Sequence, residues 1–247
     1  MADALDEPGA APDGAETSRV AASAAMRSTL ERVAESERTL TRQGRRTRNQ
    51  LVRGAKKVFE EKGYHNTRIA DITTAADTAI GTFYTYFESK EEIFRVLLIE
   101  LENEVYEEPT RLPRDAAPQE RLRETNRLFF QSFRRNAPFW AVIEEAAMTD
   151  DQARQVLSGR HHQSRSRTVA ALRAWQDDGL IPIDVDVAFF AIALGAMTER
   201  CAFLWFVLQE PVDFDEAVDR ITEIWVQALR MAPPSPAKGV APTPGTD

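Results

Sequence analysis

Four aromatic residues and two threonines are concentrated in one short stretch, Gly-Thr-Phe-Tyr-Thr-Tyr-Phe at positions 81–87. At helical spacing Phe83 and Phe87 share one face, which leaves Tyr84, Thr85 and Tyr86 on the other sides of the helix. A helix in a DNA groove can use tyrosine hydroxyls on phosphate oxygens, and tyrosine rings and threonine methyl groups on base edges. Taken alone, the same stretch is equally compatible with an aromatic plug in an ordinary protein core.

The elements before this stretch favour the DNA-binding interpretation. Apolar residues at helical spacing predict two helices, with Leu51, Ala55, Val58 and Phe59 in the first and Ile69, Ile72 and Ala76 in the second. The first helix is expected to end near Gly63, and Thr67 is a natural N-cap for the second. Residues 77–80 then form a tight turn, which predicts a helix-turn-helix whose last helix enters the major groove. Ser89 and Glu92 form a capping box that begins a further, long helix.

The charge distribution points the same way. Residues 42–68 contain nine Lys and Arg residues against Glu60 and Glu61, a net charge of +7. The chain as a whole carries −8, so the remaining residues carry −15. A basic block within an acidic protein is the electrostatic pattern expected for binding a phosphate backbone with one surface only, although a solvated helix face would look similar.

Residues 45 to about 95 resemble the DNA-binding domain of the tetracycline-repressor (TetR) family. The similarity to the family signature runs from Thr67 through Ala75-Ala76 to Gly-Thr-Phe-Tyr-Thr-Tyr-Phe-Glu-Ser-Lys-Glu-Glu at 81–92. The departures lie in the turn, where the family usually has Gly, Val and Ser in place of Asp77, Thr78 and Ala79. Asp tolerates the left-handed backbone that such a turn needs, whereas Ala79 lacks a hydroxyl that commonly caps the recognition helix and contacts phosphate.

The resemblance implies an all-α fold, with an N-terminal helix-turn-helix DNA-binding domain and a C-terminal helical ligand-binding and dimerisation domain. It implies that Thr67, Tyr84, Tyr86 and Lys90 contact the DNA backbone. It further implies that Ile80, Gly81, Thr82 and Thr85 approach the bases. The basic block adds Arg46, Arg48 and Arg68 to the predicted DNA contacts.

The 247 residues divide into four segments by composition and apolar pattern. Residues 1–43 form an N-terminal extension that is expected to be disordered or a frayed helix, and residues 44–106 are the predicted DNA-binding domain. Pro109, Pro113 and Pro118 mark a loop. Residues 118–231 are predicted to be a helical effector-binding and dimerisation domain, and residues 232–247 a disordered tail.

Residues 187–208 form an apolar run long enough to span a membrane. We reject a membrane span, because Glu199 and Arg200 lie within the run and each costs up to about 3 kcal/mol at a bilayer centre. An all-apolar helix in a soluble protein must be covered on every side, which predicts a partner subunit. The last helix begins with Asp213 and Glu216, and two such helices from each of two chains would form a homodimer interface. The predicted interface residues are Leu194, Cys201, Trp205, Ile221 and Trp225.

Catalysis and metal binding find little support in the sequence. There is no Gly-rich phosphate loop, Ser-His-Asp pattern or H-E-x-x-H motif, and the side chains of His161 and His162 diverge by about 100° on a helix. We therefore predict no catalytic residues, no metal site and no cofactor. Cys201 is the only cysteine, and no secretory signal opens the chain, so we expect a reducing, cytoplasmic setting.

The middle helices are rich in aromatic residues, any one of which could simply belong to the core. Together they suit a pocket for a bulky hydrophobic or amphipathic effector, oriented by a few charges. The predicted pocket residues are Phe129, Phe133, Trp140, Glu144, Trp175, Phe190, Glu199 and Phe203. The sequence thus predicts a dimeric transcriptional regulator, most simply a repressor, that binds a palindromic operator in double-stranded DNA and is released by a small ligand. An effector-independent DNA-binding protein, or a small-molecule-binding protein with a vestigial DNA-binding domain, remain as alternatives.

Overall fold

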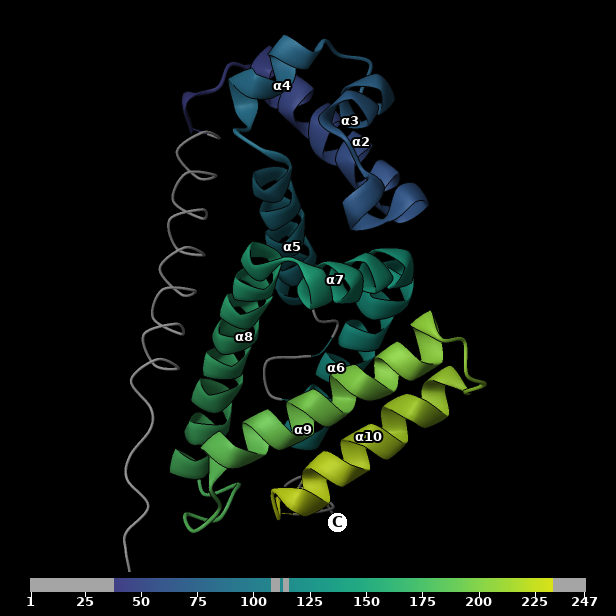
Figure 1. Cartoon of the computed structure of the whole chain (residues 1–247). Coiled ribbons are helices and arrows are strands. Elements are labelled where there is room, and N and C mark those ends of the chain that lie inside the picture. The colour runs from purple at the N-terminus through teal and green to yellow at the C-terminus, as the bar shows by residue number, and fades with distance from the viewer. Residues whose placement is uncertain (1–37, 108–111, 113–115, 233–247) are drawn as a thin grey trace, which may run out of the picture. The chain divides into compact units, whose positions relative to one another are not determined.

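The computed structural model describes residues 38–107, 112 and 116–232, and every regular element in these residues is helical (Figure 1). The predicted N-terminal extension up to residue 37 and the tail from residue 233 lie outside the described residues. The elements are α2 (Arg42–Asn66), α3 (Ile69–Ala75), α4 (Ile80–Tyr86), α5 (Lys90–Glu107), α6 (Pro118–Arg135), α7 (Ala137–Thr149), α8 (Asp151–Asp177), α9 (Val187–Ala202), the π-helical turn η1 (Phe203–Val207) and α10 (Phe214–Ala228).

The contacts within the chain divide it into two compact units. Among the described residues, the first comprises 38–107 and 132–166, and the second comprises 112, 116–131 and 167–232. The boundary expected from sequence lies in the proline-rich loop near residues 109–118. The structure instead assigns the end of α6, all of α7 and the first part of α8 to the unit that contains α2–α5.

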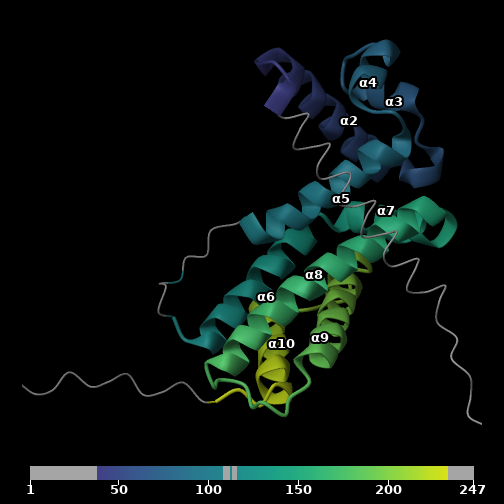
Figure 2. The same ribbon diagram turned by 90° about the vertical axis from the view of Figure 1, so that its left-hand side faces the viewer.

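The first unit is built on the apolar stripe that the sequence predicts. Leu51, Ala55, Val58 and Phe59 of α2 are buried, as is Ile72 of α3, and the two helices pack against each other. Figure 2 shows α2, α3 and α4 gathered closely together. The cap of α5 follows the prediction in part. The Ser89 hydroxyl accepts from the Glu92 amide at 3.3 Å, but the Glu92 carboxylate accepts from the amide of Glu88.

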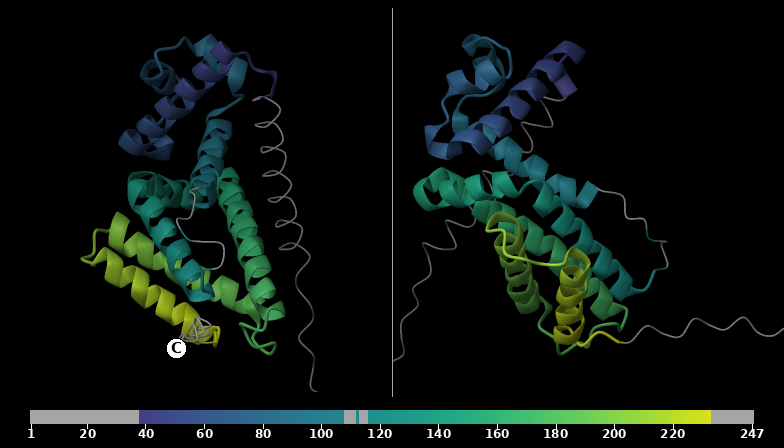
Figure 3. Two further views of the ribbon diagram at one scale, coloured as in Figure 1. Left: turned by 180° about the vertical axis from the view of Figure 1, so that it is seen from behind. Right: turned by 90° about the vertical axis from the view of Figure 1, so that its right-hand side faces the viewer.

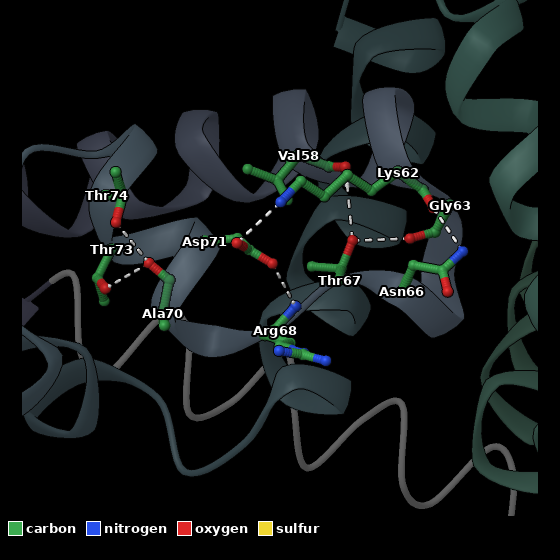
Figure 4. Close-up of polar contacts among 10 residues, drawn as sticks. All are labelled: Val58, Lys62, Gly63, Asn66, Thr67, Arg68, Ala70, Asp71, Thr73 and Thr74. Atoms are coloured by element: carbon green, nitrogen blue, oxygen red, sulfur yellow. Dashed lines mark hydrogen bonds and ion pairs between the residues drawn. The ribbon is translucent and has the colours of Figure 1, made fainter.

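The connection between α2 and α3 corrects one prediction. Gly63 breaks α2 with a left-handed φ of 78°, as the predicted helix end requires. The prediction that Thr67 caps α3 is wrong, because the cap residue is Arg68, whose amide donates to Asp71 at 3.1 Å (Figure 4). Thr67 instead donates its hydroxyl to the carbonyl of Gly63 at 2.7 Å, which satisfies an acceptor left free at the break. The following turn contains Asp77 at φ 52°, in the left-handed conformation expected for it.

In the second unit, α9 and α10 lie side by side as an antiparallel pair (Figures 1 and 3). Two buried side-chain hydrogen bonds join α10 to the helices beside it. Trp225 Nε1 of α10 donates to Thr198 Oγ1 of α9 at 2.9 Å, and Asn126 Nδ2 of α6 donates to Thr222 Oγ1 of α10 at 3.0 Å. Asp213 begins α10 as predicted, since its carboxylate accepts from the amide of Glu216.

The predicted dimer interface needs correction at three of its five residues. Leu194, Ile221 and Trp225 are buried within the single chain, because α9 and α10 use these side chains against their own unit. Cys201 and Trp205 are half-buried. The exposed large apolar side chains of this pair are Phe189 and Ile192 on α9 and Ile224 on α10.

The helical segment Val187–Val207 is long and apolar enough to cross a membrane by length and composition. It carries Glu199 and Arg200, as noted above, and only 28% of its most apolar window is buried within the chain. The chain therefore covers this segment only in part, and Phe189 and Ile192 are among its exposed residues.

Candidate nucleic-acid interface

Helix α4 is a short helix held by two aromatic anchors. Phe83 and Phe87 are buried, and their rings lie 5.6 Å apart between centroids. With one face fixed in this way, the opposite face is displayed: Tyr84 is 58% exposed, and Ile80, Gly81 and Thr85 are exposed as well. Thr82 and Tyr86 are half-buried at its edges. The structure thus brings all six predicted α4 contacts onto one short, seven-residue helix.

Two local hydrogen-bond patterns on α4 limit which groups are available. The Thr85 hydroxyl donates to the carbonyl of Gly81 at 3.2 Å, so it is used inside the helix. Ala79 at the N-cap makes no side-chain cap hydrogen bond, which agrees with the hydroxyl expected to be missing there. The amides of the first turn are therefore not occupied by a cap side chain.

Basic residues flank α4 at the start of α2. A Cβ atom built on Gly44 would lie 3.5 Å from the hydroxyl oxygen of Tyr86, so the first turn of α2 adjoins the end of α4. Arg42, Arg45 and Arg46 of this turn are exposed, as is Arg68 at the start of α3. Positive charge is thus placed beside the displayed face of α4, where a phosphate backbone would need it.

Two residues predicted to contact DNA are not available to it. Arg48 is 3% exposed, and its guanidinium carbon lies 5.4 Å from the centre of the Phe87 ring, so it supports the aromatic anchor. Thr67 is also 3% exposed, and its hydroxyl serves the break in α2. The residue types fit phosphate contacts, but the fold uses both side chains internally.

Lys90 also has an internal partner that the sequence did not reveal. Its ammonium group donates to the carbonyl of Tyr64 at 2.9 Å and lies 4.4 Å from the centre of the Tyr64 ring. Burial, together with the nearby carboxylates of Glu91 and Asp150, raises the pKa of the Tyr64 hydroxyl well above its usual range. Tyr64 was not singled out in the sequence, since only its position after Gly63 distinguishes it from other core aromatics.

The predicted pocket residues are distributed over both units. Phe133, Trp140 and Glu144 belong to the first unit, where the rings of Phe133 and Trp140 stack at 4.4 Å and are buried. Glu144 is exposed, and its neighbour Glu145 is the residue that accepts hydrogen bonds from the end of α2.

The second unit contains the remaining pocket residues and an aromatic cluster of its own. Phe130 is fully buried and packs edge-on against Trp205 at 5.5 Å and against Phe206 at 6.1 Å. Arg200 covers the ring of Phe203 at 4.8 Å. The other predicted pocket residues in this unit are Phe129, Trp175, Phe190 and Glu199.

Comparison with known proteins assigns both parts of the chain. Residues 51–97 match the family model of bacterial regulatory proteins of the tetR family, and residues 122–230 match the C-terminal domain of the transcriptional regulator EthR. The chain is 24% identical over 188 residues to the HTH-type transcriptional regulator EthR of Mycolicibacterium smegmatis, covering 72% of this chain and 84% of the relative.

Two solved structures share the fold. A TetR-family transcriptional regulator from Syntrophomonas wolfei superposes with a TM-score of 0.65 at 23% identity, covering 74% of this chain and 94% of that one. The flavonoid-responsive regulator FrrA gives a TM-score of 0.58 at 22% identity, covering 74% and 96%. The helix-turn-helix geometry and both family matches agree. The chain is a member of the TetR family, a family of DNA-binding transcriptional regulators and not of enzymes.

Proposed function

We propose that this protein represses transcription by binding a palindromic operator as a two-fold homodimer, and that a small hydrophobic or amphipathic ligand releases it. The observation that carries this proposal is the display of α4. Two buried phenylalanines hold a seven-residue helix whose opposite face presents Ile80, Gly81 and Tyr84, beside an exposed basic turn of α2. In this proposal residues 44–106 bind DNA, and residues 118–231 bind the effector and form the dimer. We also propose that the protein works in the cytoplasm, where an operator would be found.

The proposed DNA contacts fall into two groups. Arg46, Arg68, Tyr84 and Tyr86 contact the phosphate backbone, and they position α4 without reading sequence. Ile80, Gly81, Thr82 and the methyl group of Thr85 approach the base edges in the major groove. Arg46→Ala should therefore weaken binding equally on all sequences and lower the salt slope by about one unit, whereas Thr82→Ala should relax sequence preference.

A second copy of the chain is the proposed cover for α9 and α10. Phe189, Ile192 and Ile224 are exposed, although a helix this apolar is expected to be buried on all sides. A two-fold axis brings the same patch of both subunits together. It also turns two α4 helices toward one duplex, with half-sites about 34–36 Å apart or a multiple of that.

The effector class is supported by residue chemistry. Each unit contains an aromatic cluster, with Phe133 stacked on Trp140 in the first and Phe130 packed on Trp205 in the second. A site lined by such side chains suits a bulky apolar molecule. The fold shared with a flavonoid-responsive regulator agrees with a ligand of this class. The ligand would act by binding more tightly to a dimer state that cannot engage the operator, because only differential affinity shifts such an equilibrium.

A gel shift with the DNA upstream of the protein's own gene tests the proposal. The wild-type chain should retard this DNA at moderate salt, Tyr84→Phe should bind more weakly, and a panel of aromatic and lipid-like compounds should contain one that abolishes the shift. Sugars and divalent metal ions serve as the polar comparison set. Release by a polar compound, with every apolar compound inert, would contradict the proposed effector class.

A further inference from the structure

Tyr64, the residue after the break in α2, is held by all three of its polar groups. Its amide donates to Glu145 Oε2 at 3.2 Å, its hydroxyl donates to Asp150 Oδ2 at 3.1 Å, and its carbonyl accepts from Lys90 Nζ at 2.9 Å. Its ring packs against Phe94 at 4.8 Å, and the side chain is 1% exposed. We refer to Tyr64, Lys90, Glu145 and Asp150 as the Tyr64 clamp.

Glu145 of α7 binds the end of α2 in the way that a free anion would. Its second carboxylate oxygen accepts from the amide of His65 at 3.4 Å, so two successive amides converge on one carboxylate. Both amides follow Gly63, whose positive φ of 78° turns the backbone out of the helix just before them. Gly63 also makes room, since a Cβ there would lie 2.6 Å from Glu145 Oε2. The α2 break and Glu145 are thus matched in both charge and shape.

Asp150 ties the clamp to the next helix. While one of its oxygens accepts from Tyr64, the other accepts from the amide of Ala153 at 2.9 Å in the first turn of α8. One carboxylate therefore caps α8 and holds Tyr64 at the same time. The α7–α8 corner is thus linked to the end of α2 through one side chain.

The start of α7 is tied to the DNA-binding helices as well. Lys56 of α2 donates to Asn136 Oδ1 at 2.5 Å, and Asn136 Nδ2 donates to Glu104 of α5 at 2.9 Å. Polar contacts thus hold both ends of α7, which is 13 residues long. The family model of the EthR C-terminal domain, which matches residues 122–230, includes α7. The contacts within the chain nevertheless assign α7 to the unit that contains α2–α5.

We propose that Glu145 is a positioning residue for DNA binding, because its carboxylate locks the α2–α3 turn onto α7 and so fixes the direction in which α4 is presented. The inference rests on the proposed function as a dimer that reads two half-sites. A firmly held α4 accepts one half-site separation, whereas a loosely held α4 accepts several. Glu145 touches no DNA in this account and acts only through the turn.

The test compares Glu145→Ala and Glu145→Gln with Glu144→Ala in the full-length protein. Glu144 is the adjacent carboxylate on the same helix and is exposed, so it is a matched control for charge and helix propensity. It was among the predicted pocket residues, and every assay is therefore run without effector. Hydrogen–deuterium exchange without DNA should show the amides of Tyr64 and His65 exchanging about 10-fold faster in Glu145→Ala, as expected for losing a hydrogen bond to a charged group. Glu144→Ala should exchange like the wild type.

The second readout is operator geometry. On DNA selected by the wild type, duplexes with one or two base pairs added between the half-sites should bind at least about 10-fold more weakly to the wild type and to Glu144→Ala, the size expected when one half-site contact is lost. Both Glu145 variants should lose most of this discrimination. A residue with a merely structural role would weaken binding by the same factor at every separation.

Three results would overturn the proposal. They are unchanged exchange at Tyr64 and His65 in Glu145→Ala, equal weakening at all separations, and equal behaviour of the Glu145 and Glu144 variants. If the wild type itself selected no DNA, the proposed function would fail and this inference with it. A wild type that selects an inverted repeat while Glu145→Ala keeps full discrimination would refute the clamp alone.

Discussion

A glycine inside a helix lowers the stability of the helix. Its presence is explained where the backbone has a positive φ or where a close neighbour leaves no room for a Cβ. Gly54 of α2 is explained by its neighbours, since a Cβ there would lie 3.1 Å from atoms of Ala76. Gly81 of α4 has no such reason within the described residues: its backbone is helical, and none of their atoms beyond its own helix backbone lies within 4 Å of where a Cβ would be. Because Gly81 lies on the displayed face of α4, we propose that the close neighbour that accounts for it is DNA.

Gly81→Ala should consequently separate stability from function. The variant should raise the free energy of unfolding by about 0.5–1 kcal/mol, the helix-propensity difference between the two residues. It should weaken DNA binding by about 10-fold or more, because one good base contact is worth about 1–3 kcal/mol. Urea denaturation and fluorescence anisotropy on labelled DNA measure the two effects. Unchanged DNA affinity in the more stable variant would remove Gly81 from the interface.

The raised pKa of Tyr64 makes the stability of the fold sensitive to alkaline pH. The folded-state pKa lies above the unfolded value of about 10, so the stabilisation is fully present below that value and is lost as pH rises through it toward the folded pKa. Tyr64→Phe should cost about 1 kcal/mol near neutral pH, through the lost hydrogen bond to Asp150, and should show a smaller decline between about pH 9 and about pH 11. Urea midpoints of both proteins across this range check it. Parallel declines would show that Tyr64 ionises as readily in the folded chain as in the unfolded one.

At the scale of elements, the sequence pattern of α9 predicted the helix but not which of its residues are buried. The apolar run correctly predicted a helix that its own chain does not fully cover, and 28% burial of its most apolar window agrees. It could not tell which residues face inward, because nearly every position is apolar. Leu194 was expected at the dimer interface, but it is buried against its own unit, so a charge there would disrupt the monomer. The exposed side of α9 is marked by Phe189 and Ile192.

Ile192→Glu tests the proposed dimer face, with Ile183→Glu as its matched control. Both isoleucines are exposed in the single chain, at 45% and 85%, but Ile183 lies in the loop before α9. Burying an unpaired carboxylate costs about 3–5 kcal/mol, so Ile192→Glu should weaken dimerisation by at least about 100-fold, and Ile183→Glu should not. Sedimentation velocity at micromolar concentration distinguishes the two. A stable Ile192→Glu dimer would move the interface elsewhere.

Helices α2–α5 were predictable because each is a local pattern: an apolar stripe, a glycine break, a turn and a capping pair. Most of the displayed face of α4 followed from the same patterns, since two phenylalanines at i and i+4 decide which side is buried. Arg48 and Lys90 were assigned to DNA from residue type and resemblance. The structure places them on Phe87 and Tyr64, respectively, because long basic side chains also pack on aromatic rings.

At the scale of the whole molecule, the contacts that join distant segments could not be read from the sequence. Tyr64 and Glu145 are 81 residues apart, and Lys56 and Asn136 are 80 apart. No periodicity or local motif links such pairs, since each depends on how α7 packs on α2. For the same reason the proline-rich loop gave a sensible sequence boundary, but the contacts assign α7 to the unit that carries the DNA-binding helices.

The central claim is that two copies of this chain read an inverted repeat through α4. The most direct measurement is to select duplexes from a random-sequence library with the full-length protein and to sequence what is retained. The account predicts that the wild type enriches an inverted repeat, whose half-sites lie about one helical turn, or a multiple of it, apart. Gly81→Ala, folded and at least as stable, should enrich it far less. Retained DNA with no common sequence, or with a single half-site and no symmetry, would contradict the account.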